Sequence, residues 1–190
     1  MSSLLHFVGP WSALNAATFV LVGAWTFDRR QTGAALGAVL GVLLTLAGLA
    51  GLGLYGSPSE SVLRQGLALA LLAASSALFV GAWLSALGTS LGAITSRGEP
   101  SVLLDFGLYR LVRHPFYASY LATFWAVAMA AADWTPAICA AAATVLYGVA
   151  ARLEERAFAR TPLAADYRAY CRRTGMFWPR RRRPPPARGA

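Results

Sequence analysis

The chain has 190 residues, of which 57% are hydrophobic and only 13% are charged, and its mean hydropathy is +0.51. A soluble domain normally carries about a quarter charged residues, so this composition argues against a soluble domain. The formal net charge of +9 does not indicate nucleic-acid binding. Most of the arginines follow the last apolar run and are not interleaved with polar residues on a surface, as a nucleic-acid-binding protein would have them. The composition therefore predicts an integral membrane protein.

Five apolar runs predict an all-α fold, a bundle of five transmembrane helices. The runs at 8–27, 34–56 and 66–87 are long enough to cross a bilayer alone. The shorter runs at 116–132 and 136–151 are typical of a helical hairpin that either crosses the membrane or dips into it. This divides the chain into a three-helix scaffold (1–87), a region that carries most polar groups (88–179) and a basic, proline-rich, disordered tail (180–190).

Arginine positions predict the orientation of the bundle. With a cytoplasmic C-terminus, five spans place 16 of the 17 arginines on the cytoplasmic side and only Arg64 outside. The N-terminus is then outside. The first run has no preceding basic residue and no cleavage site, so it is interpreted as a span and not as a signal peptide. The arginine-rich tail is expected to lie against anionic headgroups, at roughly 1 kcal/mol per arginine.

A first polar cluster, at 107–117, directly precedes the fourth apolar run. Pro115 predicts the first turn of a helix, where its missing N–H costs nothing, and it keeps His114 extended. The start of a helix presents free N–H groups and the positive end of its dipole. With the donors of Arg113 and His114 beside it, this position predicts a pocket for a carboxylate or another anion.

A second polar cluster contains Glu154 and Glu155 at the end of the fifth run. Adjacent side chains on a helix diverge by about 100°, so at most one of the two is expected to face inward with Tyr109 or Tyr117. A carboxylate at membrane depth needs a cation or a hydroxyl donor. Because the hairpin brings both clusters to one level, they could hold a zwitterionic ligand that carries hydroxyls.

The same residues also allow a purely structural interpretation. Arg-His-Pro can be a juxtamembrane anchor before a helix start, and Glu154 can pair with Arg113 or Arg156. Tyr167 and Tyr170, three residues apart, favour the packing of an interfacial helix. No histidine or cysteine cluster has metal-ligand spacing, so no metal site is predicted.

Taken in chain order, these motifs resemble the isoprenylcysteine carboxyl methyltransferase family, and phospholipid N-methyltransferases share a related version. The resemblance covers roughly residues 84–179, and the five predicted spans match small prokaryotic members. Its residues are Leu87-Gly88, Gly107, Tyr109, Arg113-His114-Pro115, Tyr117, Glu154-Glu155, Tyr167, Tyr170, Thr174-Gly175 and Pro179.

The resemblance implies S-adenosylmethionine as the cofactor. The helix start would hold its amino acid end, one glutamate would take its ammonium or ribose hydroxyls, and the loop 101–109 would wrap its adenine. Two tyrosine rings could face the sulfonium, since aromatic faces favour cations. Ser101 departs from the family, which usually has histidine there. The implied cofactor-binding residues are Ser101, Leu103, Leu104, Gly107, Tyr109, Arg113, His114, Tyr117, Glu154 and Glu155.

The implied reaction is in-line methyl transfer to a lipophilic acceptor that enters from the bilayer. Alignment of the two reactants can supply roughly 7–11 kcal/mol of the barrier. An isoprenylcysteine-type carboxylate is favoured and needs no base, whereas a phospholipid amine or a thiol needs a proton acceptor. The candidate catalytic residues are His114, Glu155 and Arg113.

The arginine-only, alanine-rich composition is typical of a high-GC bacterium, which predicts the inner membrane as the location. Two other classes share the pattern. Membrane sterol reductases carry a related half that binds NADPH, but they are larger and have more spans. A non-catalytic membrane protein with a degenerate cofactor pocket is favoured only by Ser101. The bound ligand distinguishes the three classes, and the sequence does not specify an oligomeric state.

Overall fold

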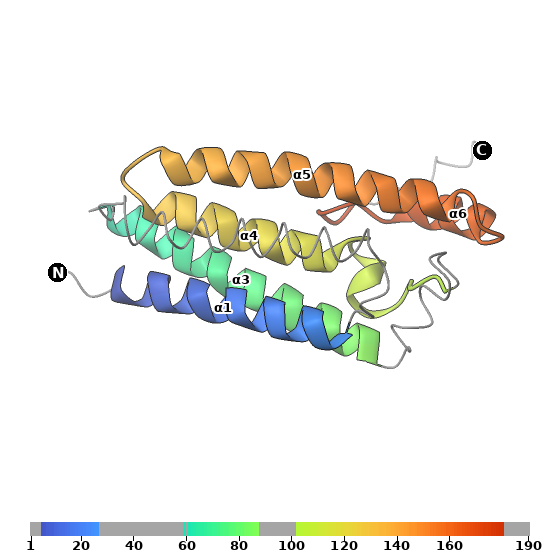
Figure 1. Ribbon diagram of the computed structural model, residues 1–190, viewed down its shortest axis with the longest axis horizontal. Helices are drawn as coiled ribbons and strands as arrows, with labels where there is room; N and C mark the ends of the chain where they lie inside the picture. The colour runs from blue at the N-terminus through green and yellow to red at the C-terminus, as the bar shows by residue number, and fades with distance from the viewer. Residues whose placement is uncertain (1–4, 27–58, 60, 88–101, 181–190) are drawn as a thin grey trace, which may run out of the picture.

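The computed structural model describes residues 5–26, 59, 61–87 and 102–180. Figure 1 shows the four long helices side by side, with α4 running opposite to α1, α3 and α5. The all-α prediction is confirmed for these residues. Their elements are α1 (Leu5–Thr26), α3 (Val62–Leu87), the 3-10 helix η2 (Gly107–Arg110), α4 (Pro115–Ala130), α5 (Thr135–Phe158) and α6 (Ala164–Arg173).

Some predicted features lie outside the described residues. They are the second span (34–56), Gly88, Ser101 and the tail after Arg180. The predicted first, third, fourth and fifth spans coincide with α1, α3, α4 and α5. The count of five spans and their orientation therefore stay predictions.

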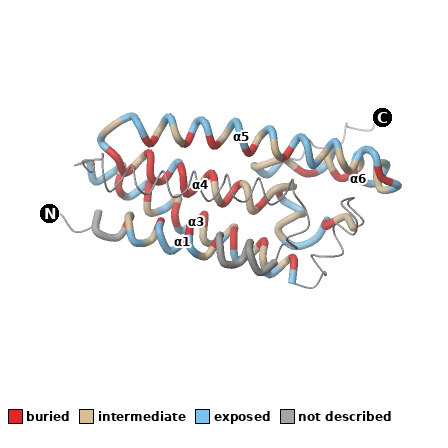
Figure 2. Tube along the Cα trace, viewed as in Figure 1, coloured by how far each residue is buried: buried red, intermediate tan, exposed pale blue. Residues whose placement is uncertain are grey.

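Two of the described helices, α3 and α5, are long and apolar enough to cross a membrane. In each, only 28% of the most apolar window is buried inside the protein. The outward side of α5 is exposed along its length (Figure 2) and carries Ile138, Val145, Leu146, Val149 and Leu153. A continuous apolar exterior of this kind is what lipid contact requires and what water disfavours.

The centre of the bundle is the contact between α3 and α4, the most extensive pair of helices. Ser75 of α3 donates to the carbonyl of Ser119 (2.7 Å), and its hydroxyl lies 2.8 Å from that of Thr123. Small side chains let the two helices approach closely, and the hydroxyls satisfy one another away from water. One turn further along α3, Phe19 of α1 packs on Phe79 with ring centroids 4.5 Å apart, and both rings also contact that of Tyr120 in α4.

The predicted hairpin is confirmed, and its two helices differ in length. Trp125 Nε1 of α4 donates to Thr144 Oγ1 of α5 (3.2 Å), which fixes how the helices lie against each other. With 16 and 24 residues, α4 and α5 are about 24 and 36 Å long at 1.5 Å per residue. The last turns of α5 therefore extend beyond the start of α4. These turns carry the two glutamates.

Arg64, the one arginine predicted outside, has a structural partner. Its Nη2 donates to the carbonyl of Ala131 (2.7 Å), directly after the last residue of α4. The N–H of Ser59 donates to the carbonyl of Ala130 (2.9 Å). Carbonyls at a helix C-terminus lack helical partners, and a cation there complements the helix dipole.

At the opposite end of the bundle, η2 is docked on the last turns of α3. The N–H of Leu108 donates to Ser85 Oγ (3.2 Å), which in turn donates to the carbonyl of Gly81 (2.7 Å). Gly107 has a φ of +56°, and a Cβ at this position would lie 2.1 Å from Ser85 Oγ. Only glycine fits here, so Gly107 sets where the first polar cluster starts.

Gly107→Ala is therefore expected to destabilise the protein, because it combines an unfavourable φ with a clash against α3. Strain of this kind costs about 1–3 kcal/mol before the clash is added. The measurement is the melting temperature in detergent by circular dichroism. Gly148→Ala is the control, because nothing lies within 4 Å of its Cβ position and alanine favours a helix by about 0.5–1 kcal/mol. Equal melting temperatures for the two variants would contradict this account of Gly107.

Candidate functional site

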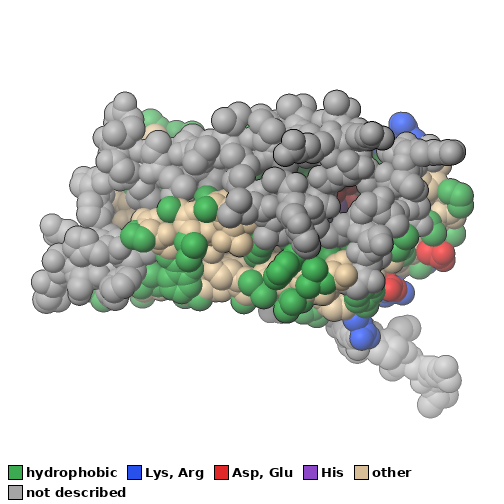
Figure 3. All heavy atoms as spheres, turned by 60° about the horizontal axis from the view of Figure 1, so that its bottom comes forward, with side chains coloured by type: hydrophobic (Ala, Val, Ile, Leu, Met, Phe, Trp, Pro, Cys, Tyr) green, Lys and Arg blue, Asp and Glu red, His purple; other side chains and the backbone are tan. Residues whose placement is uncertain are grey.

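The two polar clusters meet where α5 passes the start of α4. Arg113 Nε donates to Glu155 Oε1 over 2.8 Å, and these side chains are 11% and 20% exposed. On the face shown in Figure 3, the visible charged side chains lie toward one end of the molecule, while patches of hydrophobic side chains are visible at several places along it. The hairpin thus brings the clusters to one level, as its geometry predicts.

His114 lies between both glutamates. Its Nδ1 is 3.4 Å from Glu154 Oε2, and its Nε2 is 3.4 Å from Glu155 Oε1. Only Glu154 contacts Tyr117, in agreement with the prediction that at most one glutamate faces that tyrosine, but both glutamates contact His114. The helix directions do diverge, but the two nitrogens of an imidazole also point in different directions and glutamate side chains are long. One ring can therefore contact both carboxylates.

Tyr117, in the first turn of α4, contacts two members of this cluster. Its hydroxyl donates to Glu154 Oε1, and its ring is stacked on that of His114, with centroids 5.5 Å apart and planes 4° from parallel. Tyr109 takes part differently: its backbone carbonyl accepts a hydrogen bond from the hydroxyl of Tyr170 (2.6 Å). Tyr170 and Tyr167 are buried, so their predicted role in packing α6 is confirmed.

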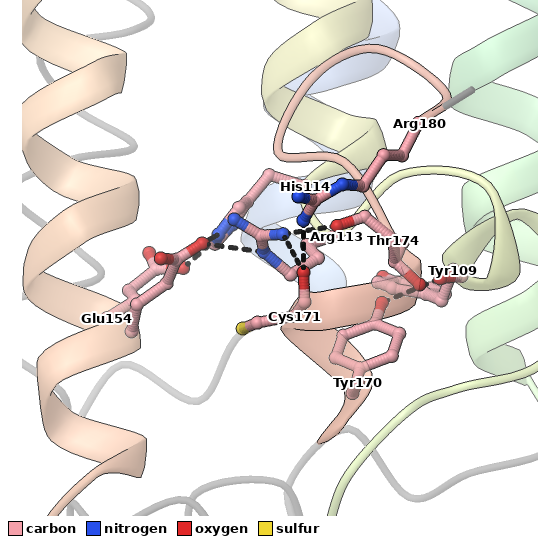
Figure 4. A network of polar contacts seen from close by, with 9 residues as sticks. Tyr109, Arg113, His114, Glu154, Tyr170, Cys171, Thr174 and Arg180 are labelled. Atoms are coloured by element: carbon pink, nitrogen blue, oxygen red, sulfur yellow. Dashed lines mark hydrogen bonds and ion pairs between the residues drawn. The ribbon is translucent and has the colours of Figure 1, made fainter. Parts of the chain in front are cut away.

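A short non-helical segment after α6, residues 174–180, crosses the site; we call it the strap. The N–H of Arg113 donates to the carbonyl of Gly175 (2.8 Å), and the N–H of His114 donates to that of Met176 (3.1 Å). Arg113 Nη1 donates to the carbonyl of Thr174 and, over 3.4 Å, to that of Cys171 in α6 (Figure 4). The strap therefore holds both the backbone and the side chain of Arg113.

These strap contacts could not be predicted from the sequence. Backbone carbonyls carry no side-chain signal, so any residue could supply them. One signal does exist at Gly175, where a Cβ would lie 1.8 Å from the carbonyl oxygen of Trp178. The close turn of the strap explains why glycine follows Thr174.

The other predicted site residues that the structure describes are Leu103, Leu104 and Gly107, on the chain that leads into η2 or at its start. Leu104 is buried and Leu103 half-buried, on the chain that leads into η2. Gly107 packs on α3, as described above. Ser101 lies outside the described residues, so its contacts stay a prediction.

The electrostatics of the cluster favour the charged form of His114. Burial alone would lower the pKa of His114, but hydrogen bonds and charges from Glu154 and Glu155 outweigh it and raise this pKa above its ordinary value. Burial also raises the pKa of Tyr109, which keeps its hydroxyl neutral. The cluster therefore pairs two cations with two carboxylates.

Not every group of the cluster is used internally. In the part of the chain that the structure describes, Arg113 Nη2 makes no hydrogen bond. Glu154 is 48% exposed, whereas Glu155 is engaged by both Arg113 and His114. The structural alternative that Glu154 pairs with Arg113 is wrong, because Glu155 is the partner. A donor and a carboxylate thus remain available to a ligand with both charges.

Comparison with known proteins gave one match. A family model described as phospholipid methyltransferase matches residues 63–162, more than half of the chain. This range includes α3, η2, α4 and α5 with both polar clusters, and it ends before α6 and the strap. Neither the curated proteins nor the solved structures gave a match.

The raised pKa of His114 predicts how stability depends on pH. Because the folded pKa lies above the unfolded value of about 6.5, the stabilisation is complete below that value and is lost as pH rises through the folded pKa. The melting temperature of the wild type should therefore fall over this range. His114→Gln, which cannot titrate, should lose this part of the pH dependence. Identical profiles would contradict the double contact of His114.

Proposed function

The chain belongs to the phospholipid methyltransferase family, and from the site at the end of its α4–α5 hairpin we propose that it uses S-adenosylmethionine to methylate a lipophilic acceptor. Membership makes it a membrane methyltransferase. The cofactor, the acceptor and the orientation in the membrane are our proposal.

The observation that carries the proposal is an available donor, Arg113 Nη2, and a half-exposed carboxylate, Glu154, in one cluster. The amino acid end of the cofactor carries a carboxylate and an ammonium on the same carbon atom. Arg113 Nη2 and the start of α4 suit the carboxylate, and the exposed Glu154 suits the ammonium or the ribose hydroxyls. Glu155 is left to orient Arg113 and His114.

The other contacts follow the family resemblance. We propose that the chain from Ser101 through Leu103, Leu104 and Gly107 to Tyr109 lies against the adenine. The ring of Tyr117, stacked on His114, is placed to contribute to the site of the sulfonium. The acceptor would enter from the bilayer, and the cofactor from the cytoplasm.

Bound S-adenosylmethionine would supply an electrophilic methyl group. The protein then has to orient the reactants and exclude water. Arg113, Glu155 and His114 are fixed by one another and by strap carbonyls, which keeps the cofactor end of the site rigid. A carboxylate acceptor needs no proton acceptor and remains the first candidate.

An amine acceptor is the second candidate; Glu154 would then serve the acceptor, and Arg113 Nη2 with the start of α4 would hold the amino acid end of the cofactor. Methylation of an amine releases a proton, which needs a base. Both ring nitrogens of His114 already contact carboxylates, so His114 is the less suitable acceptor. The exposed carboxylate of Glu154 can attract an ammonium and accept the proton.

Calorimetry with S-adenosylhomocysteine tests the cofactor site in detergent-purified protein. Wild type should bind, and Arg113→Ala and Glu154→Gln should each weaken binding roughly tenfold or more, since each removes a charge-assisted hydrogen bond. Arg110→Ala is the matched control, because Arg110 is an exposed arginine of η2. Glu154→Gln removes a charge beside His114, so circular dichroism should first show that this variant is folded at the temperature of the calorimetry.

Absence of binding by folded wild-type protein would overturn the proposed cofactor. It would favour the non-catalytic alternative, in which Ser101 marks a lost site. Binding of NADPH instead would favour the reductase class.

A further inference from the structure

Consecutive residues of the strap point in opposite directions, one toward the core of the protein and one toward its surroundings. Phe177 packs against the core formed by α4 and α5, with its ring 6.1 Å from that of His114. The next residue, Trp178, is 79% exposed. The carbonyl of Trp178 lies against Gly175, so the exposed indole stands on a tight turn of fixed geometry.

Basic residues lie close to this tryptophan in the chain, in the strap and at the end of α6. Arg180 Nη1 donates to the carbonyl of Cys171 (3.2 Å), Arg172 is exposed, and Arg173 pairs with Asp105 (2.6 Å). Between residues 164 and 180 there are four arginines and one acidic residue, and the sequence continues with three more arginines. The outer side of the strap and α6 is therefore cationic and carries a large aromatic side chain.

The inner side of the same strap holds the site. Its carbonyls bind the N–H groups of Arg113 and His114, and Arg113 and Arg180 share the carbonyl of Cys171 (Figure 4). A change in the position of Trp178 or Arg180 would therefore move the carbonyl groups that bind Arg113. None of the strap lies in the family match, which ends at residue 162.

We propose that Trp178 and Arg180 dock on the anionic surface of the bilayer and that this docking fixes the strap in the position that holds Arg113 and His114. Tryptophan favours the membrane interface, where its ring is apolar and its N–H can reach water or headgroups. Arginines near an anionic leaflet are attracted to it. If the strap is already docked when the cofactor binds, less conformational entropy is lost on binding. Anionic lipid should therefore increase the affinity for the cofactor.

The first test measures docking itself and does not depend on the proposed function. Full-length protein is reconstituted in vesicles that contain phosphatidylcholine and phosphatidylglycerol, with bromine on the acyl chains of one or the other. Brominated phosphatidylglycerol should quench tryptophan fluorescence more than brominated phosphatidylcholine. The excess should vanish in Trp178→Phe and persist in Trp134→Phe, since Trp134 is 72% exposed at the other end of the hairpin.

Equal quenching by the two lipids, or an excess that survives Trp178→Phe, would overturn the docking proposal. A soluble acidic peptide that abolishes the excess quenching by brominated phosphatidylglycerol would also overturn the docking proposal, and it would point to a protein partner. Both substitutions affect exposed side chains, and unchanged melting temperatures would confirm that the variants are folded.

The second test measures coupling and rests on the proposed function. The affinity for S-adenosylhomocysteine is compared in vesicles with and without phosphatidylglycerol. Anionic lipid should tighten binding roughly fivefold, the effect of about one arginine at the surface. Trp178→Ala and Arg180→Gln should lose this gain, and Arg180→Lys should keep it. Glutamine retains a donor for the carbonyl of Cys171 and lacks only the charge.

The outcomes separate the two proposals. Binding that is equal with and without anionic lipid would overturn the coupling while it supports the cofactor. No binding in any lipid would overturn the cofactor, and the quenching experiment would still decide whether the strap docks.

Discussion

The ion pair between Arg113 and Glu155 is the interaction on which the site end of this protein depends. It joins the segment before α4 to the end of α5, and the same guanidinium reaches carbonyls at the end of α6 and in the strap. Removing one partner of a mostly buried pair leaves an uncompensated charge, at about 3–5 kcal/mol. Glu155, Thr174 and Cys171 satisfy that charge, and in doing so they build a cluster with a defined geometry.

The unequal hairpin explains where this cluster lies. Since α5 is longer than α4, its last turns leave the apolar bundle and run beside Arg113 and His114. Charged side chains are therefore concentrated in these last turns, while the outward side of α5 before them is apolar, with exposed Ile138, Val145 and Val149. A site at the end of a membrane hairpin is accessible both to a polar cofactor and to a lipophilic acceptor. This placement agrees with the membrane methyltransferase family to which the chain belongs.

Much of this arrangement could be predicted from the sequence. Apolar runs marked α1, α3, α4 and α5, Pro115 marked the start of α4, and the short loop after Ala130 marked the hairpin. The resemblance picked out the residues that the hairpin then brings together. These features are visible because each depends on residue type and spacing.

Other features could not be predicted, for physical reasons. The contacts of His114 with both glutamates depend on side-chain reach, which a helical projection ignores. The strap carbonyls depend on backbone position and not on residue identity. Arg64 is the one arginine that the sequence places on the outer side of the membrane, and only its hydrogen bond to Ala131 identifies it as a cap for α4. Gly107 resembles a cofactor-loop glycine, whereas its contact with Ser85 gives it a role in docking η2 on α3.

The most direct test of the central claim is transfer of a tritiated methyl group from S-adenosylmethionine to lipids extracted from bacterial membranes. The account predicts label in the organic phase with wild type and with Arg110→Ala, and none with Arg113→Ala. Label released by mild base would identify a carboxylate ester, and label that resists base would identify an amine or a thiol. Two results would contradict the claim that Arg113 belongs to a methyltransferase site: equal transfer by Arg113→Ala and wild type, or no transfer by folded wild-type protein to any extracted lipid.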